Sequence, residues 1–180
     1  RPFPSGNFKY IIVLVNVFTR KAYMKPITQK TPDVVERGLK TILDRAGDLQ
    51  VISSDQGMEW TGKVAKLLEN RNIRHRLKAT GDRNSLAVVD RLIGTLKVKL
   101  QKALTKQNKS RWDSEIKKVE DSYNSTSHGH LMGEEPGDIP DVVKYELFEQ
   151  SAAAIKKNNE LNNKRTDSLL TTMRYRAPLP

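Results

Sequence analysis

The chain has 180 residues, a length typical of one domain with at most a short extension. Hydrophobic residues make up 37% and aromatic residues 6%, so we expect one core built mainly from aliphatic side chains. The net charge of +11 favours a polyanionic partner such as nucleic acid, although a generally basic soluble surface would give the same balance.

Cysteine is absent, which excludes disulfides, thiol catalysis and every zinc site that uses cysteine. This is compatible with a reducing compartment, and we expect an intracellular protein, with nucleus and organelle not distinguished. No apolar run approaches the roughly 18 residues of a membrane helix, and no targeting segment is visible. The chain begins at Arg1 and not at methionine, so we expect a processed product or part of a longer protein.

The first residues predict a pair of strands. Residues 8–18 are β-branched and almost all apolar, which is typical of a strand buried on both faces. Residues 20–28 alternate more and suit a neighbouring strand. The short connection at Thr19 and Arg20 favours an antiparallel hairpin.

A helix is predicted next, with Thr31 as its N-cap, Pro32 at its first position and Gly47 at its end. Shorter elements follow: a strand at 49–53, a helix at 62–70 and a strand at 73–77.

The second half of the chain is predicted to be helical. After a polar loop at 78–84, Ser85 can cap a long helix over 86–104, whose apolar residues recur every three or four positions. Further helices are expected at 110–124 and 141–163, the first with Trp112, Ile116, Val119 and Tyr123 facing inward. We expect residues 154–168, which are rich in Lys and Asn, to be a mobile linker and the last residues to be extended. This order predicts an α/β core domain at 1–140 and a C-terminal helical extension with a linker at 141–180.

Three polar residues are candidates for a site. Asn16 interrupts a buried apolar run, so it needs hydrogen-bond partners or serves a site. Asp55 follows a buried strand, where it could reach a pocket or simply belong to a turn before Gly57. Asp90 stands early in the long helix, where the helix dipole is a sufficient structural reason for an acid. Two-metal phosphoryl transfer needs several carboxylates that converge from separate elements on hard ions such as Mg²⁺.

Four segments together resemble the catalytic core of retroviral-type integrases, including those of gypsy-like retrotransposons and Polinton/Maverick elements. They are YIIVLVNVFTRKAYMKPITQKT, LQVISSDQGMEW, IRHRLKATGDRNSLAVVDRLIGTLKVKL and DSYNSTSHGHLMGEEPGDI. The resemblance covers about three quarters of the chain, and 35 residues separate Asp55 from Asp90, close to the usual gap. It implies a ribonuclease-H-like α/β fold with a mixed sheet of about five strands flanked by helices. It also implies that Asn16, Asp55 and Asp90 occupy the three metal-carboxylate positions, with Glu59 as a candidate auxiliary acid.

This chain departs from the family pattern around the predicted site. Asn16 replaces an aspartate, Asp90 replaces a glutamate, and Ile93 and Gly94 replace polar residues one turn beyond Asp90. Loss of one anionic ligand from a two-metal site commonly costs several kcal/mol, or roughly 10³-fold in rate. We therefore expect a degenerate, inactive site. If the site is active, Asp55 and Asp90 would hold Mg²⁺ or Mn²⁺.

Basic residues on the long helix are the predicted nucleic-acid contacts, although a solvated helix face would look the same. They are Arg91, Lys97, Lys99, Lys102 and Lys106. The three histidines, His75, His128 and His130, are too scattered to predict a zinc site.

Three functions remain open. The first is a domesticated, inactive integrase core that binds DNA or RNA as a structural subunit of a larger protein or ribonucleoprotein assembly, with a homodimer expected by analogy. The second is an active Mg²⁺-dependent polynucleotidyl transferase that performs strand transfer for a mobile element. The third is a protein-interaction scaffold, and in none of them do we expect a membrane partner.

Overall fold

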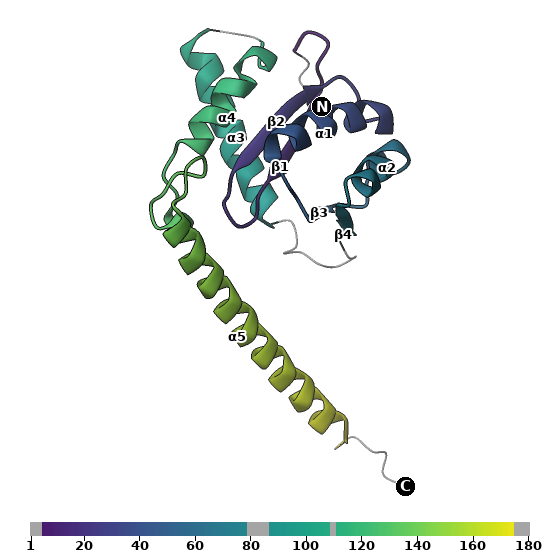
Figure 1. Ribbon diagram of the computed structural model, residues 1–180, viewed down its shortest axis with the longest axis vertical. Helices are drawn as coiled ribbons and strands as arrows, with labels where there is room; N and C mark the ends of the chain where they lie inside the picture. The colour runs from purple at the N-terminus through teal and green to yellow at the C-terminus, as the bar shows by residue number, and fades with distance from the viewer. Residues whose placement is uncertain (1–4, 79–86, 109–110, 175–180) are drawn as a thin grey trace.

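The computed structural model describes residues 5–78, 87–108 and 111–174, which form a mixed α/β body from which one long helix projects (Figure 1). The strands are β1 (Tyr10–Val15), β2 (Ala22–Ile27), β3 (Val51–Ser54) and β4 (Arg74–Leu77). The α-helices are α1 (Pro32–Ala46), α2 (Lys63–Asn70), α3 (Ala87–Lys106), α4 (Ile116–Asn124) and α5 (Asp141–Arg174). Short 3₁₀ turns are η1 (Met58–Trp60), η2 (Asp113–Glu115) and η3 (Gly129–Leu131). In the described ranges, no helix is long and apolar enough to cross a membrane.

The strands form two small sheets, so the predicted single sheet of about five strands is not found in the described residues. β1 and β2 are antiparallel, with Tyr10 opposite Ile27, whereas β3 and β4 are parallel, with Val51 opposite Arg74. Residues of β1 and of β3 line one pocket, and the two strands are not paired with each other in the described part of the chain.

The β1–β2 sheet packs against apolar side chains on both faces, although each residue of β1 is half-buried and not fully buried as its apolar run predicted. On one face α1 and α2 bury Leu39, Leu43, Val64 and Leu68. The helix α1 approaches closely at Gly38, where a Cβ would lie 2.8 Å from the Ile12 side chain. On the other face α3 contributes Leu92 and Leu96, and α4 contributes Ile116, Val119 and Tyr123, together with Trp112 from the segment before η2.

The helix α1 begins and ends at the residues that the sequence predicts. Thr31 precedes the helix but makes no side-chain capping hydrogen bond, Pro32 is at the first turn, and Gly47 ends the helix with φ 77°. The predicted cap Ser85 and nearly all of the loop at 78–84 lie outside the described residues.

The helix α5 is longer than predicted, and the expected linker at 154–168 is wrong. The helix runs from Asp141 to Arg174 without a break. Neither Pro nor Gly occurs between Pro140 and Pro178, and Lys, Glu, Leu and Ala are all good helix formers. A high content of Lys and Asn was therefore a poor reason to expect an irregular backbone.

The outer edge of β2 is closed by side chains of α4 and α1. Asn124 donates from Nδ2 to the Ala22 carbonyl and accepts the Ala22 N–H at Oδ1, each at 2.9 Å. Two residues further along, Glu120 accepts the Met24 N–H at 2.5 Å, and Arg45 donates to the Met24 carbonyl at 3.2 Å. The next residue at this edge is Pro26, which has no N–H to satisfy.

We predict that Glu120→Gln lowers the free energy of unfolding by about 1–3 kcal/mol, because the buried carboxylate bonds to Arg45 at 2.7 Å and to the β2 backbone. Urea denaturation measures this difference. Asp121→Asn is the matched control, since the carboxylate of this exposed neighbour forms an ion pair with Lys117, and losing that pair should cost less than about 1 kcal/mol. Equal losses for both variants would contradict the role assigned to Glu120.

Candidate functional site

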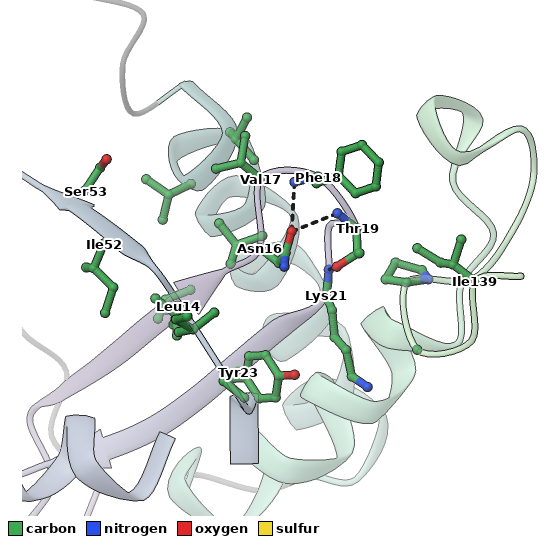
Figure 2. Close-up of a pocket in the computed structure, with 18 of the residues that line it drawn as sticks. Leu14, Asn16, Val17, Phe18, Thr19, Lys21, Tyr23, Ile52, Ser53 and Ile139 are labelled. Atoms are coloured by element: carbon green, nitrogen blue, oxygen red, sulfur yellow. Dashed lines mark hydrogen bonds between the residues drawn. The ribbon is translucent and has the colours of Figure 1, made fainter. Parts of the chain in front are cut away.

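Asn16 stands in the connection that follows β1, and its side-chain oxygen is directed at the backbone. Its Oδ1 accepts the N–H groups of Phe18 and Thr19, each at 2.9 Å (Figure 2). Its own N–H donates to the Lys21 carbonyl at 2.9 Å, so the residue closes the turn between β1 and β2. This is the usual side-chain–backbone bonding of an Asx turn, and it explains the amide in this half-buried position.

Asp55 follows β3 and is held by the aromatic residue of its own motif. Its Oδ1 accepts the indole N–H of Trp60 at 3.1 Å and, more weakly, the Gly57 N–H at 3.4 Å. The Trp60 ring lies against His75, at 5.5 Å between centroids. The Nε2 atom of His75 is 2.8 Å from the Ser54 hydroxyl, and burial lowers the pKa of this histidine. The carboxylate is exposed to solvent but fixed in direction.

Asp90 is exposed in the first turn of α3. Asn16, Ser53 and Val89 all line one pocket of about 610 Å³. Asp55 lies two residues after Ser53 and Asp90 directly follows Val89, so these two predicted positions are sequence neighbours of residues that line the pocket. Only Asn16 of the three lines the pocket itself.

The described residues do not fit a divalent metal ion. A hard cation of the Mg²⁺ type binds six or more oxygen ligands, several of them anionic. Within the described part of the chain, no group of three or more His, Asp or Glu side chains is placed to hold a metal. The Asn16 oxygen is already bonded to two backbone N–H groups. We therefore derive no chemical step through a metal from these residues.

The predicted basic residues of α3 fall into three groups. Arg91, Lys102 and Lys106 are exposed and lie on one ridge of the helix, at intervals of eleven and four residues. Lys97 is exposed on the ridge that carries Asp90, seven residues earlier. Lys99 is engaged by α4, because its Nζ donates to the Ser122 carbonyl and hydroxyl and to the Thr126 hydroxyl at 3.1–3.3 Å. The prediction of Lys99 as a nucleic-acid contact therefore has no support from its position.

A second group of basic residues was missed by the sequence reasoning. Arg20 is in the β1–β2 turn with φ 60°, and its NH1 atom is buried with no hydrogen-bond partner among the described residues. Burial lowers the Arg20 pKa, and the positive charge of Arg91 lowers it further. Burial and the charge of Arg20 also lower the pKa values of His128 and His130. Arg20 and both histidines lie in segments that resemble the integrase family. Their basic side chains were read only as part of that resemblance and were not predicted to form a group.

A family model and a viral polyprotein resemble this chain in sequence. The family model described as the integrase core domain matches residues 2–83. The Gag-Pol polyprotein of walleye dermal sarcoma virus is 28% identical over 62% of this chain, and the chain spans about 7% of that polyprotein's length.

Two solved structures share the fold. The HTLV-2 integrase catalytic core domain in complex with magnesium has a TM-score of 0.65 and 18% identity, over 77% of this chain and 90% of that chain. Integrase in the intasome of simian T-cell lymphotropic virus, solved in complex with a PP2A regulatory subunit, has a TM-score of 0.62 and 20% identity. That match covers 69% of this chain and 45% of the other.

The described residues thus have the ribonuclease-H-like α/β fold of retroviral integrase catalytic cores. The resemblance to a retroviral-type integrase core that the sequence motifs predicted is confirmed by the family model and by the relatives. The family match ends at residue 83, before Asp90 and α3.

The lowered histidine pKa values predict that the protein loses stability in mild acid. In the unfolded chain each histidine should titrate near 6.5, whereas burial lowers the pKa values of His75, His128 and His130 in the fold. Below that pH the unfolded chain binds more protons, so the free energy of unfolding should decrease as the pH falls from about 7 to 5. Urea denaturation at several pH values measures this slope. The double variant His128→Gln with His130→Gln should show a shallower slope, and an unchanged slope would contradict the prediction.

Proposed function

We propose that this chain is an integrase-core domain that binds nucleic acid through α3 and the β1–β2 turn and that does not transfer strands on its own. The observation that carries the proposal is the combination of an exposed basic ridge with an incomplete set of metal ligands in the described residues. In this view the protein is a domesticated nucleic-acid-binding subunit of a larger assembly.

The ridge has the length and charge for contacts with a phosphate backbone. Arg91 and Lys106 are fifteen residues apart, which is about 22 Å along a helix. Lys102 lies between them on the same ridge, and no ion pair with an acidic side chain is recorded for any of the three among the described residues. At the N-terminal end of the ridge, Arg20 lies close enough to Arg91 for their charges to interact. Cations in such a row bind phosphates by releasing condensed counterions.

We predict that Lys102→Ala with Lys106→Ala weakens binding to duplex DNA and reduces the slope of log K against log [salt] by about 2, since each phosphate contact contributes about one unit. Fluorescence anisotropy at a series of salt concentrations measures both quantities. Lys40→Ala with Lys66→Ala is the control, because it removes the same charge from exposed positions on α1 and α2. Equal effects of the two double variants would reject the ridge, and absence of any salt-dependent binding would favour the protein-interaction scaffold.

The proposal that the protein is catalytically inactive rests on the residues at the three predicted ligand positions. Asp55 is held by Trp60, and Asp90 is exposed at the start of α3, yet the position predicted for the first ligand is an amide bonded to its own turn. A neutral amide oxygen is a weaker ligand for a hard cation than a carboxylate. The alternative is an active integrase in which Asp55 and Asp90 bind Mg²⁺ or Mn²⁺ together with a further ligand.

We predict that the protein of 180 residues forms no strand-transfer product with labelled duplex DNA in the presence of Mg²⁺ or Mn²⁺. The readout is a strand-transfer assay resolved on a sequencing gel. Metal-dependent product that is lost in Asp55→Ala, but kept in Asp121→Asn, would overturn the proposal of inactivity in favour of the active enzyme. Asp121 is a suitable control because it is an exposed aspartate on α4, where it contacts Lys117.

We also propose that α5 contributes to assembly. Val142, Tyr145 and Phe148 are each more than 60% exposed, although Leu147 on the opposite side of the helix packs against Leu131 and Ile139. Integrase relatives have been described as a trimeric core and within an intasome, and this chain could assemble by its projecting helix with a second copy or with another protein.

A further inference from the structure

An apolar groove of about 350 Å³ remains open between the β1–β2 sheet and the helices α3 and α4. Ile11 and Met24 line it from the sheet, Ile93 and Leu100 from α3, and Ile116 from α4. Ile93 stands where the family pattern has a polar residue, so this change adds an apolar side chain to the groove. Concave, mainly apolar sites of this size are where proteins bind small ligands or the side chains of a partner.

The polar residues that line the groove include two lysines and, among the described residues, no acid. Lys9 and Lys97 are both exposed, so their ammonium groups reach solvent beside the apolar surface. Neither has a recorded ion pair in the described ranges. An occupant that suits this groove is therefore apolar in its centre and negatively charged at its side.

The projecting helix α5 has a face with these properties. Tyr145 and Phe148 are 66% and 61% exposed, and Ala152 continues their line at the next turn. This spacing of three and seven residues is the one by which a helix presents apolar side chains to a groove. Glu146 and Glu149 follow one border of the face, and both are exposed without a recorded ion pair in the described part of the chain.

The body of the same copy does not cover this face of α5. Leu147, on the opposite side of the helix, packs against Leu131 and Ile139 and so holds the start of α5 to the body. From there the helix leads away from the two sheets (Figure 1). One chain thus carries an acidic apolar helix face and a basic apolar groove, and each lacks a partner within the copy. Exposed apolar patches bordered by charge are typical of interaction surfaces.

We propose that α5 of one copy docks in the groove between the sheet, α3 and α4 of a second copy. Tyr145 and Phe148 enter the apolar groove, and the two glutamates on the border of α5 meet Lys9 and Lys97. The contact is heterologous, because the two copies contribute different surfaces, so two copies can exchange helices or further copies can add head to tail. This inference rests on the proposal that α5 contributes to assembly, and it does not depend on nucleic-acid binding.

The first measurement is self-association of the 180-residue protein without nucleic acid, by sedimentation equilibrium from about 1 μM to about 1 mM. We predict that mass increases with concentration and that Phe148→Ala lowers the association constant at least tenfold, because buried aromatic side chains supply much of the energy of such contacts. Met58→Ala is the matched control, since this large apolar side chain is 82% exposed on η1, outside both surfaces. A monomer at every concentration, or equal effects of the two variants, would overturn the proposal.

The second measurement reverses the charges of each surface. Lys9→Glu with Lys97→Glu makes the groove acidic, and Glu146→Lys with Glu149→Lys makes the helix face basic. Each double variant alone should associate at least tenfold more weakly than the unchanged protein, because like charges then face each other. An equimolar mixture of the two should recover association, since each α5 then meets a groove of opposite charge. Both variants keep a net positive charge, starting from +11, so attraction between their net charges does not explain recovery.

The mixture also distinguishes other modes of assembly. If the helix variant loses association but the groove variant keeps it, α5 binds to another surface, such as a second α5, and the proposal is rejected. Failure of the mixture to recover, with both variants folded by circular dichroism, would reject it as well. Lys40→Glu with Lys66→Glu, which reverses exposed charges on α1 and α2, should leave association unchanged, and an equal loss in this control would reject a specific role of the groove. Arg91, Lys102 and Lys106 are unchanged in every variant, so the salt dependence of DNA binding still tests the proposed nucleic-acid interface separately.

Discussion

The fold depends on the contact between α4 and the outer edge of β2. Glu120 is buried, and it joins three elements by bonding to the β2 backbone, to Arg45 of α1 and to Lys117 of its own helix. A buried carboxylate is costly to desolvate, and here the cost is offset because each oxygen has two donors. The same contact covers the strand edge, since Asn124 takes both backbone groups of Ala22. The β1–β2 pair is thereby closed on its outer side and covered on both faces.

This contact also fixes the position of α3, the helix that carries the proposed interface. Lys99 of α3 donates to Ser122 and Thr126 at the C-terminal end of α4. Leu92 and Leu96 pack with the inward side chains of α4 in the same apolar cluster. With its buried side fixed in this way, α3 exposes Arg91, Lys102 and Lys106 to solvent. Lys99, by contrast, is bonded to α4. A lysine in a basic run can therefore have a structural role that its neighbours do not share.

Periodicity predicted the helices and strands well, because apolar spacing reports which face of a local element is buried. It predicted the inward residues of α4 and the two buried faces of β1. It could not predict that α5 continues to Arg174, since the second half of this helix has no regular apolar stripe for periodicity to detect. It also could not show where Asn16 directs its oxygen or that Asn124 closes a strand edge. Asn124 contacts a residue 102 positions away in the sequence, and Asn16 bonds within a turn, and apolar spacing reports neither kind of contact.

The position of Asn16 changes how the candidate site is interpreted. Sequence alone favoured a lost carboxylate, yet the amide is bonded to the turn and lies at the mouth of the pocket between β1 and β3. The amide is explained by the turn that it closes, so it need not be a degenerate metal ligand. The changes at Ile93 and Gly94 on the Asp90 helix are separate from this argument, because the turn at Asn16 does not explain the loss of the polar groups that the family has there.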